Sequence, residues 1–266
     1  MANTTITELF NSRIFNPKAK PKREVVITVR ESVVGTLQSF VVFTGLPKAS
    51  KSTFIAGAIA SAYCTYDVFH IKITPPAGRS QILYVDTESS EYDFYQQIEK
   101  IRAQLLRNSL PQELVPISCR EDEPGTIIKL IEYYLDKYKE CAIVVIDGLL
   151  DLINNYNDER EGKQLINWLK KITKKYDCLV ICVIHQSKGS GNTLGHLGSM
   201  ADRYCQSSLE IVKEKSTNQF VMKPKLLRSV GDFDPVAIQC INGNWGLCDY
   251  IEPETILTKP KAKPNK

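Results

Sequence analysis

From about residue 21 onward, the chain alternates short runs of consecutive apolar residues with longer segments that are apolar on one face only. The runs QILYVDT (81–87) and AIVVIDG (142–148) consist largely of β-branched and aliphatic residues, which is typical of strands buried on both faces of a sheet. Between such runs, apolar residues recur at the spacing of a helix, first over residues 52–64. The pattern therefore predicts buried strands that are joined by helices.

Four or more buried strands separated by helices indicate an α/β fold, with a mostly parallel central sheet that helices cover on both faces. The predicted strands of this part are 25–29, 39–45, 81–87, 115–119, 142–148 and 178–186, and the predicted helices are 52–64, 91–107, 124–138 and 159–176. Three more strand candidates follow without an intervening helix, at 207–215, 218–228 and 235–243. We expect these three to add antiparallel strands at one edge of the sheet.

A single main domain over residues 31–250 is the simplest division, because 266 residues are enough for one large core and no repeat is visible. Residues 1–30 form an N-terminal arm in this division. Its stretch TITELF (5–10) suggests a short helix that docks on a neighbouring subunit, although the role of the arm stays open. The basic stretch 251–266 is too polar to pack and predicts a disordered tail.

Charge and cysteine content add little that is specific. The net charge of +4 is concentrated in the runs 17–23, 169–175 and 258–266, which are either solvated faces or contacts to a polyanion. The eight cysteines have no metal-ligand spacing and are expected to be buried, reduced side chains. No apolar stretch approaches the roughly 18 residues that cross a bilayer, so we expect a cytoplasmic protein without a membrane partner.

The stretch GLPKASKST (45–53) nearly matches the phosphate-binding pattern G-x-x-x-x-G-K-[ST] and lies between a predicted strand and a predicted helix. In such a loop the backbone N–H groups bind ATP phosphates, Lys51 reaches the β and γ phosphates, and Ser52 holds Mg²⁺. Ser50 replaces the second glycine of the pattern. Its steric cost in conformational free energy is about 1 kcal/mol if the position needs positive φ, and near zero otherwise. Lys48 either touches the γ phosphate or, as we favour, points to solvent. The predicted nucleotide-binding residues are Gly45, Leu46, Pro47, Lys48, Ala49, Ser50, Lys51, Ser52 and Thr53.

Three further motifs follow in order: LYVDTE (83–88), VVIDG (144–148) and VIHQSKG (183–189). With these motifs the chain resembles the RecA-like branch of P-loop ATPases, particularly the RepA-like hexameric helicases and related ATPases of plasmids and mobile elements. The resemblance spans about residues 33–239. It implies a RecA-like P-loop NTPase fold and Mg-dependent ATP hydrolysis at the subunit interfaces of a homo-oligomeric ring or filament that acts on DNA.

The resemblance also implies catalytic roles. Asp147 matches the Walker B aspartate and would hold Mg²⁺ together with Ser52, because an acid at the carboxyl end of a strand beside the P-loop can bind the metal through water. The alternative role for Asp147 is that of a helix cap. Glu88 is the residue expected to orient the attacking water, and only the resemblance favours it over Asp86 or Glu91.

His185 and Gln186 resemble the family's sensor of the γ phosphate, and Gln186 is the better candidate. The alternative for His185 is an ordinary strand-end residue. The following loop, 187–199, either faces DNA in a central channel or is a flexible linker. On a late strand, Lys225 and Arg228 are either residues that reach the γ phosphate of a neighbouring subunit, or members of a solvated edge strand. We expect contact with single-stranded DNA through its backbone, independent of sequence, because no sequence-reading motif is recognisable.

Three functions fit these observations. The first is a DNA-dependent ATPase, either a helicase or an accessory of mobilisation or replication. The second is a nucleotide-gated interaction protein that hydrolyses ATP slowly and recruits a partner, as indicated by Ser50 and by the absence of a glutamate next to Asp147. The third, a small-molecule kinase, would need an arginine-rich lid that the C-terminal strand candidates do not resemble.

Overall fold

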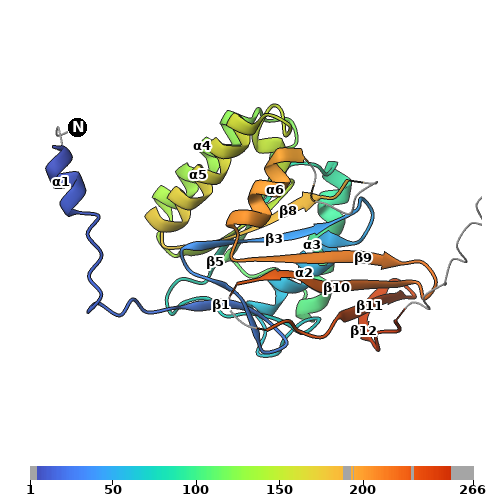
Figure 1. The fold of residues 1–266 in the computed structure, drawn as a ribbon. Coiled ribbons are helices and arrows are strands. Elements are labelled where there is room, and N and C mark those ends of the chain that lie inside the picture. Colours follow the sequence, from blue (N-terminus) through green and yellow to red (C-terminus); the bar gives the residue numbers. More distant parts are fainter. Residues whose placement is uncertain (1–4, 188–192, 194, 229–230, 253–266) are drawn as a thin grey trace, which may run out of the picture.

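A large twisted sheet forms the centre of the molecule (Figure 1). In the computed structural model, which describes residues 5–187, 193, 195–228 and 231–252, nine strands belong to it. They are β3 (Ser39–Gly45), β5 (Gln81–Asp86), β6 (Leu114–Ser118), β7 (Cys141–Asp147), β8 (Leu179–His185), β9 (Ser207–Glu214), β10 (Gln219–Leu227), β11 (Val236–Ile241) and β12 (Asn244–Cys248). Their order is β12-β11-β10-β9-β3-β8-β7-β5-β6, and the strands from β9 to β6 are parallel. The predicted α/β fold with antiparallel strands at the C-terminal edge is confirmed.

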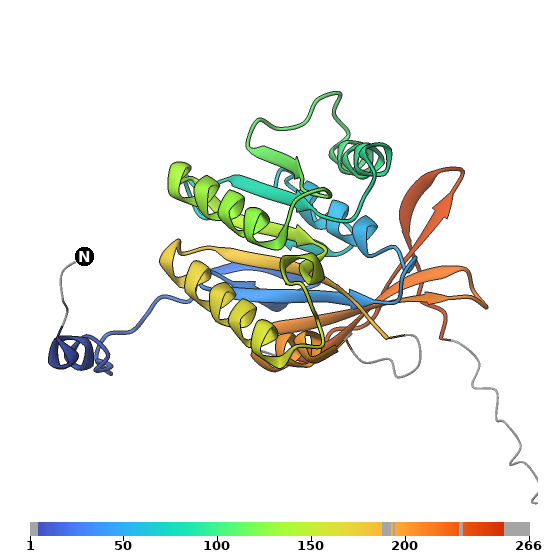
Figure 2. The same cartoon turned by 90° about the horizontal axis from the view of Figure 1, so that it is seen from above.

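Helices cover both faces of the parallel part (Figures 1 and 2). The helices are α1 (Ile6–Asn11), α2 (Lys51–Ser61), α3 (Glu91–Leu105), α4 (Pro124–Lys137), the 3₁₀ helix η1 (Leu149–Leu152), α5 (Glu159–Lys175) and α6 (Gly195–Tyr204). Alternate residues of β7 pack on opposite faces: Ile143 and Val145 belong to the core with α2 and α3, while Val144 and Ile146 belong to the core with α4, α5 and α6. Because both faces are buried, β7 is a continuous apolar run in the sequence.

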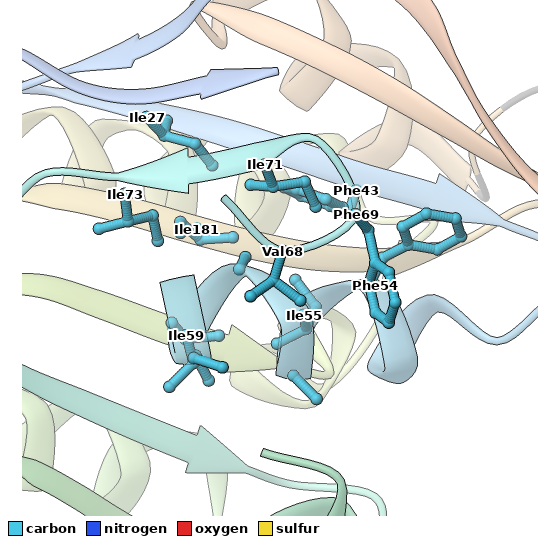
Figure 3. Close-up of a cluster of buried hydrophobic side chains, with 14 of the residues drawn as sticks. Ile27, Phe43, Phe54, Ile55, Ile59, Val68, Phe69, Ile71, Ile73 and Ile181 are labelled. Carbon is cyan, nitrogen blue, oxygen red and sulfur yellow. The ribbon is translucent and has the colours of Figure 1, made fainter. Parts of the chain in front are cut away.

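A second, smaller sheet packs against α2 through β4 and against β3 of the central sheet through β2. It contains β1 (Val25–Val29), β2 (Ser32–Thr36) and β4 (Ile71–Ile73), in the order β2-β1-β4. Figure 3 shows Ile71 and Ile73 of β4 facing Ile55 and Ile59 of α2, and all four side chains are fully buried. The sequence predicted only β1 of these strands, because β4 has only three residues and β2 contains Gly35, and glycine is unfavourable inside strands.

The expectation that no helix lies between residue 186 and the late strands is wrong. Helix α6 occupies Gly195–Tyr204 and buries Leu197 and Ala201 against the core on the α5 side. It returns the chain to the amino-terminal edge of the sheet, so β9 pairs with β3 in parallel and only β10, β11 and β12 are antiparallel. The glycines at 195 and 198 hide this helix in the sequence, because glycine is unfavourable inside helices.

Helix α1 of the N-terminal arm stands away from the main domain (Figure 1), whereas residues 25–29 of the arm form β1 of the small sheet. Helix α1 begins with a capping box, in which the Thr5 hydroxyl accepts the Glu8 N–H and the Glu8 carboxylate accepts the Thr5 N–H, yet none of its residues is buried. The division into arm, main domain and tail stays a prediction, and residues 253–266 of the predicted disordered tail lie outside the described residues. Within the described part of the chain, no helix combines the length and the apolar character needed to span a bilayer.

Candidate functional site

The loop GLPKAS connects the carboxyl end of β3 to the start of α2, as the sequence predicted. Lys48 and Ser50 both have left-handed backbone conformations, with φ of 64° and 62°. Position 50 therefore does need positive φ, and serine there costs about 1 kcal/mol relative to glycine. The side chain of Lys48 is exposed, in agreement with the solvent-facing alternative.

Gly45 allows β9 to pack directly beside this loop. A Cβ atom at residue 45 would lie 2.2 Å from the carbonyl oxygen of Ile211, which is backbone and cannot move aside as a side chain could. The first position of the loop therefore accepts only glycine in this packing.

Lys51 lies at the first turn of α2 and is buried. Its ammonium donates to the carbonyl oxygens of Gly45 and Leu46, both at 3.1 Å, and contacts Nδ1 of His185 at 3.0 Å. Burial lowers the pKa of Lys51, and the nearby carboxylates partly oppose this effect. Since an ammonium carries three donors, all of them are used inside the protein.

His185 connects Lys51 to Glu88. Because the charged lysine cannot accept a hydrogen bond, Nδ1 of His185 is the acceptor and the ring proton lies on Nε2. Nε2 then donates to the Glu88 carboxylate at 2.9 Å. This hydrogen bond is the main reason that the pKa of Glu88 is lowered; burial opposes the effect, and the charge of Lys51 supports it. Glu88 is therefore ionised, and with 41% of its side chain exposed it faces solvent.

Asp147 ends β7 and is buried beside the helix start. Its carboxylate accepts from the Tyr84 hydroxyl at 3.3 Å and from the Ser52 hydroxyl. The pKa of Asp147 is raised to about 6, mainly by burial and also by the neighbouring carboxylates Asp86 and Glu88, while the hydrogen bonds from the two hydroxyls partly oppose the rise. A buried carboxylate next to a hydroxyl is a donor set that suits Mg²⁺, which takes its remaining ligands from phosphate oxygens and water. The residues Ser52 and Asp147 therefore fit the predicted metal.

Gly148 explains why no glutamate follows Asp147 in the sequence. It has φ of 111°, and a Cβ atom there would lie 2.0 Å from Oγ1 of Thr87. The residue after Asp147 cannot carry a side chain in this packing, so a glutamate is excluded there.

Strand β5 supplies a carboxylate beside Asp147, since Asp86 pairs with Asp147 across the ladder. Asp86 is buried and accepts from both the backbone N–H and the hydroxyl of Ser89, each at 2.8 Å. Glu91 is exposed at the start of α3. Of the three acids considered from the sequence, Glu88 is the one that hydrogen-bonds to His185.

Gln186 is buried and links the loop to β9. Its backbone N–H donates to the carbonyl of Gly45 at 3.0 Å, and its side-chain amide donates to Glu210 of β9 at 2.7 Å. The backbone of Gln186 also pairs with that of Thr193 in a single antiparallel β-bridge. Of the predicted DNA-facing loop, Lys188 lies outside the described residues and His196 belongs to α6.

Within the described part of the chain, Lys225 and Arg228 form no hydrogen bond or ion pair with the phosphate-binding loop 45–50. The Lys225 ammonium donates to the Thr193 hydroxyl and to the Asp202 carboxylate, each at 2.7 Å. Arg228 follows β10 and donates to the carbonyl oxygen of Arg203 at the end of α6. The sequence did not indicate Thr193 or Asp202, because their association with Lys225 depends on the unpredicted helix α6.

A strand, a phosphate-binding loop and a helix with a buried lysine, next to an acid at the end of a parallel strand, define a P-loop ATPase. The comparison with known families agrees. The model of a family described as AAA domain (AAA_25) matches residues 24–191, which is more than half of the chain. The protein therefore belongs to this family of AAA-type P-loop ATPases. No curated protein sequence matches the chain.

Proposed function

We propose that the protein is a Mg-dependent ATPase of the RepA-like type that acts on DNA. The observation that carries the ATPase part is the convergence of Lys51, His185, Glu88 and Asp147 at the carboxyl ends of neighbouring parallel strands. Ligands of open parallel sheets bind at this edge.

Each residue has a role in this proposal. The backbone N–H groups of the loop and of the α2 N-terminus bind the phosphates. Ser52 and Asp147 hold Mg²⁺, which supplies positive charge to the phosphate oxygens. Lys51 exchanges its contact with His185 for the γ phosphate, and Glu88 orients the attacking water. His185 and Gln186 sense the γ phosphate, because one touches Lys51 and the other joins the loop to β9.

The DNA part rests on the resemblance to RepA-like helicases and on the positive net charge of the chain. In this proposal the protein forms a homo-oligomeric ring or filament and serves as a helicase or as an accessory of mobilisation or replication. Residues 187–199 face the nucleic acid, and Lys225 or Arg228 reaches the γ phosphate of a neighbouring subunit. For Lys225 this requires release from Asp202, to which it is bound within one chain.

A nucleotide-gated switch is the second candidate function. Two features favour it: the three internal contacts of Lys51 and the strained backbone of Ser50. Phosphate binding must replace those contacts and offset that strain before hydrolysis can occur.

Substitution of Glu88 by Gln separates the two functions. For an ATPase we expect turnover to fall at least a hundredfold while ATP binding is retained, because a positioned base or water-orienting group is worth about 10²–10⁴ in rate. Steady-state phosphate release and ATP binding by the same preparation measure both quantities. Unchanged slow turnover in the variant would support the switch and contradict the role of Glu88.

A further inference from the structure

A second charged hollow lies at the opposite end of the central sheet from the P-loop. It has a volume of about 450 Å³ and is formed by the start of β3, the last turns of α5 and the segment that follows α6. Strand β3 has seven residues, so about 20 Å separates the two ends of the sheet. This hollow is therefore distinct from the ATP site.

The hollow is positively charged. Lys170, Lys174 and Arg228 line it, and among the described lining residues there is no carboxylate. None of these three cations forms an ion pair within the described part of the chain. By contrast, the adjacent Lys175 is paired with Asp136 at 3.3 Å.

Stabilisation of helix C-termini accounts for some of these positive side chains but not for all of them. Arg228 donates to a carbonyl at the end of α6, and lysines in the last turn of α5 complement the helix dipole. Lys170 lies before that last turn, and its ammonium sits 3.4 Å from the centre of the Tyr204 ring. Tyr204 is 45% exposed, so its ring is accessible beside the cation.

The N-terminal arm extends the positive surface. A neighbouring hollow of about 440 Å³ shares Lys174 and is otherwise lined by arm residues, including Arg13, Phe15 and Lys20. Phe15 is 72% exposed. The arm joins the body on the side where β3 begins (Figure 1), and Lys174 lines both hollows, so we call the two hollows together the basic groove.

We propose that the basic groove, lined by Arg13, Lys20, Lys170, Lys174 and Arg228, binds the phosphate backbone of single-stranded nucleic acid. Unpaired lysines and arginines attract phosphates without regard to sequence, and exposed aromatic rings between them provide faces on which unpaired bases stack. A duplex would leave Tyr204 and Phe15 without bases to stack on, so the single strand is the better fit. The inference rests on the DNA part of the proposed function and is independent of ATP hydrolysis.

The test uses the full-length, nucleotide-free protein in EDTA and the fluorescence anisotropy of a labelled oligothymidylate. The variant Lys170→Glu with Lys174→Glu alters the groove. Its matched control, Lys129→Glu with Lys163→Glu, makes the same change of charge on exposed lysines of α4 and α5 outside the groove. Thermal unfolding establishes that both variants are folded, and Lys170→Gln with Lys174→Gln replaces the first variant if it is not.

We expect the groove variant to bind about 25-fold more weakly at about 0.1 M salt, because each phosphate contact to a single strand contributes about fivefold there. The slope of log affinity against log salt should become shallower by about 1.4, while the control stays close to the unaltered protein. Equal losses in both variants, or no loss in the groove variant, would overturn the proposal. Binding to anionic lipid vesicles without binding to the oligonucleotide would also overturn it and would assign the groove to a membrane surface. ATP hydrolysis by the same preparation tests the ATPase separately.

Discussion

Substitution of Asp147 by Asn should stabilise the metal-free protein at alkaline pH while it removes a predicted Mg²⁺ ligand. The carboxylate is buried beside Asp86 and Glu88, and its pKa in the folded protein is about 6 instead of the ordinary 3.8. The folded state therefore binds a proton more tightly than the unfolded state. The stability that this proton gives is complete below pH 4 and is lost as the pH rises through 6.

The difference between these pKa values corresponds to about 3 kcal/mol at pH 8, since one pH unit is worth about 1.4 kcal/mol. Asparagine keeps the size of the side chain but loses part of the hydrogen bonding with Tyr84 and Ser52, which costs about 1 kcal/mol. The variant should therefore be more stable than the unaltered protein by about 2 kcal/mol at pH 8. At pH 5 about half of the electrostatic penalty remains, so the advantage should shrink by about 1.5 kcal/mol.

Urea unfolding of both proteins in EDTA, at pH 8 and at pH 5, measures these free energies. Asp232→Asn, at an exposed position, is the matched control and should change little at either pH. The electrostatic reasoning is refuted if the Asp147 variant is less stable at pH 8, or if its advantage is the same at both pH values.

Three further predictions concern other parts of the molecule. Ser50→Gly should raise the free energy of unfolding by about 1 kcal/mol in urea titrations, because φ at this residue is 62°; a loss of stability would contradict the strain. His185→Ala should move the acid limb of the pH profile of kcat to higher pH, because the hydrogen bond from His185 lowers the pKa of Glu88; an unmoved limb would show that Glu88 is not the titrating group. Deletion of residues 1–15 should reduce the oligomer mass measured by light scattering if α1, which buries no residue in its own chain, docks on a neighbouring subunit; an unchanged mass would exclude that role.

The sequence was sufficient to predict the parallel strands, because burial on both faces leaves an unmistakable run of apolar residues such as AIVVIDG. It was not sufficient for α6, whose helical state depends on packing of Leu197 and Ala201 rather than on local propensity. The small sheet escaped prediction for a related reason, since the three residues of β4 are held by their pairing with β1.

The candidate site was also predictable only in part. Lys51, Asp147 and Glu88 follow recognisable motifs, and the carboxyl ends of parallel strands had to lie at one edge. The hydrogen bonds from Lys51 to His185 and from His185 to Glu88 depend on the order in which the strands are arranged, with β8 next to β3. Strand order is a property of long-range packing, and no local pattern in the sequence specifies it.

Hydrolysis of ATP by the purified protein, with Mg²⁺ and in the presence and absence of single-stranded DNA, is the most direct test of the proposed function. Lys51→Ala is the control, because Lys51 is the predicted phosphate-binding lysine and contacts His185. We expect turnover that rises several-fold with DNA and disappears in the variant. Tight ATP binding without turnover under either condition would contradict the ATPase and favour the nucleotide-gated switch.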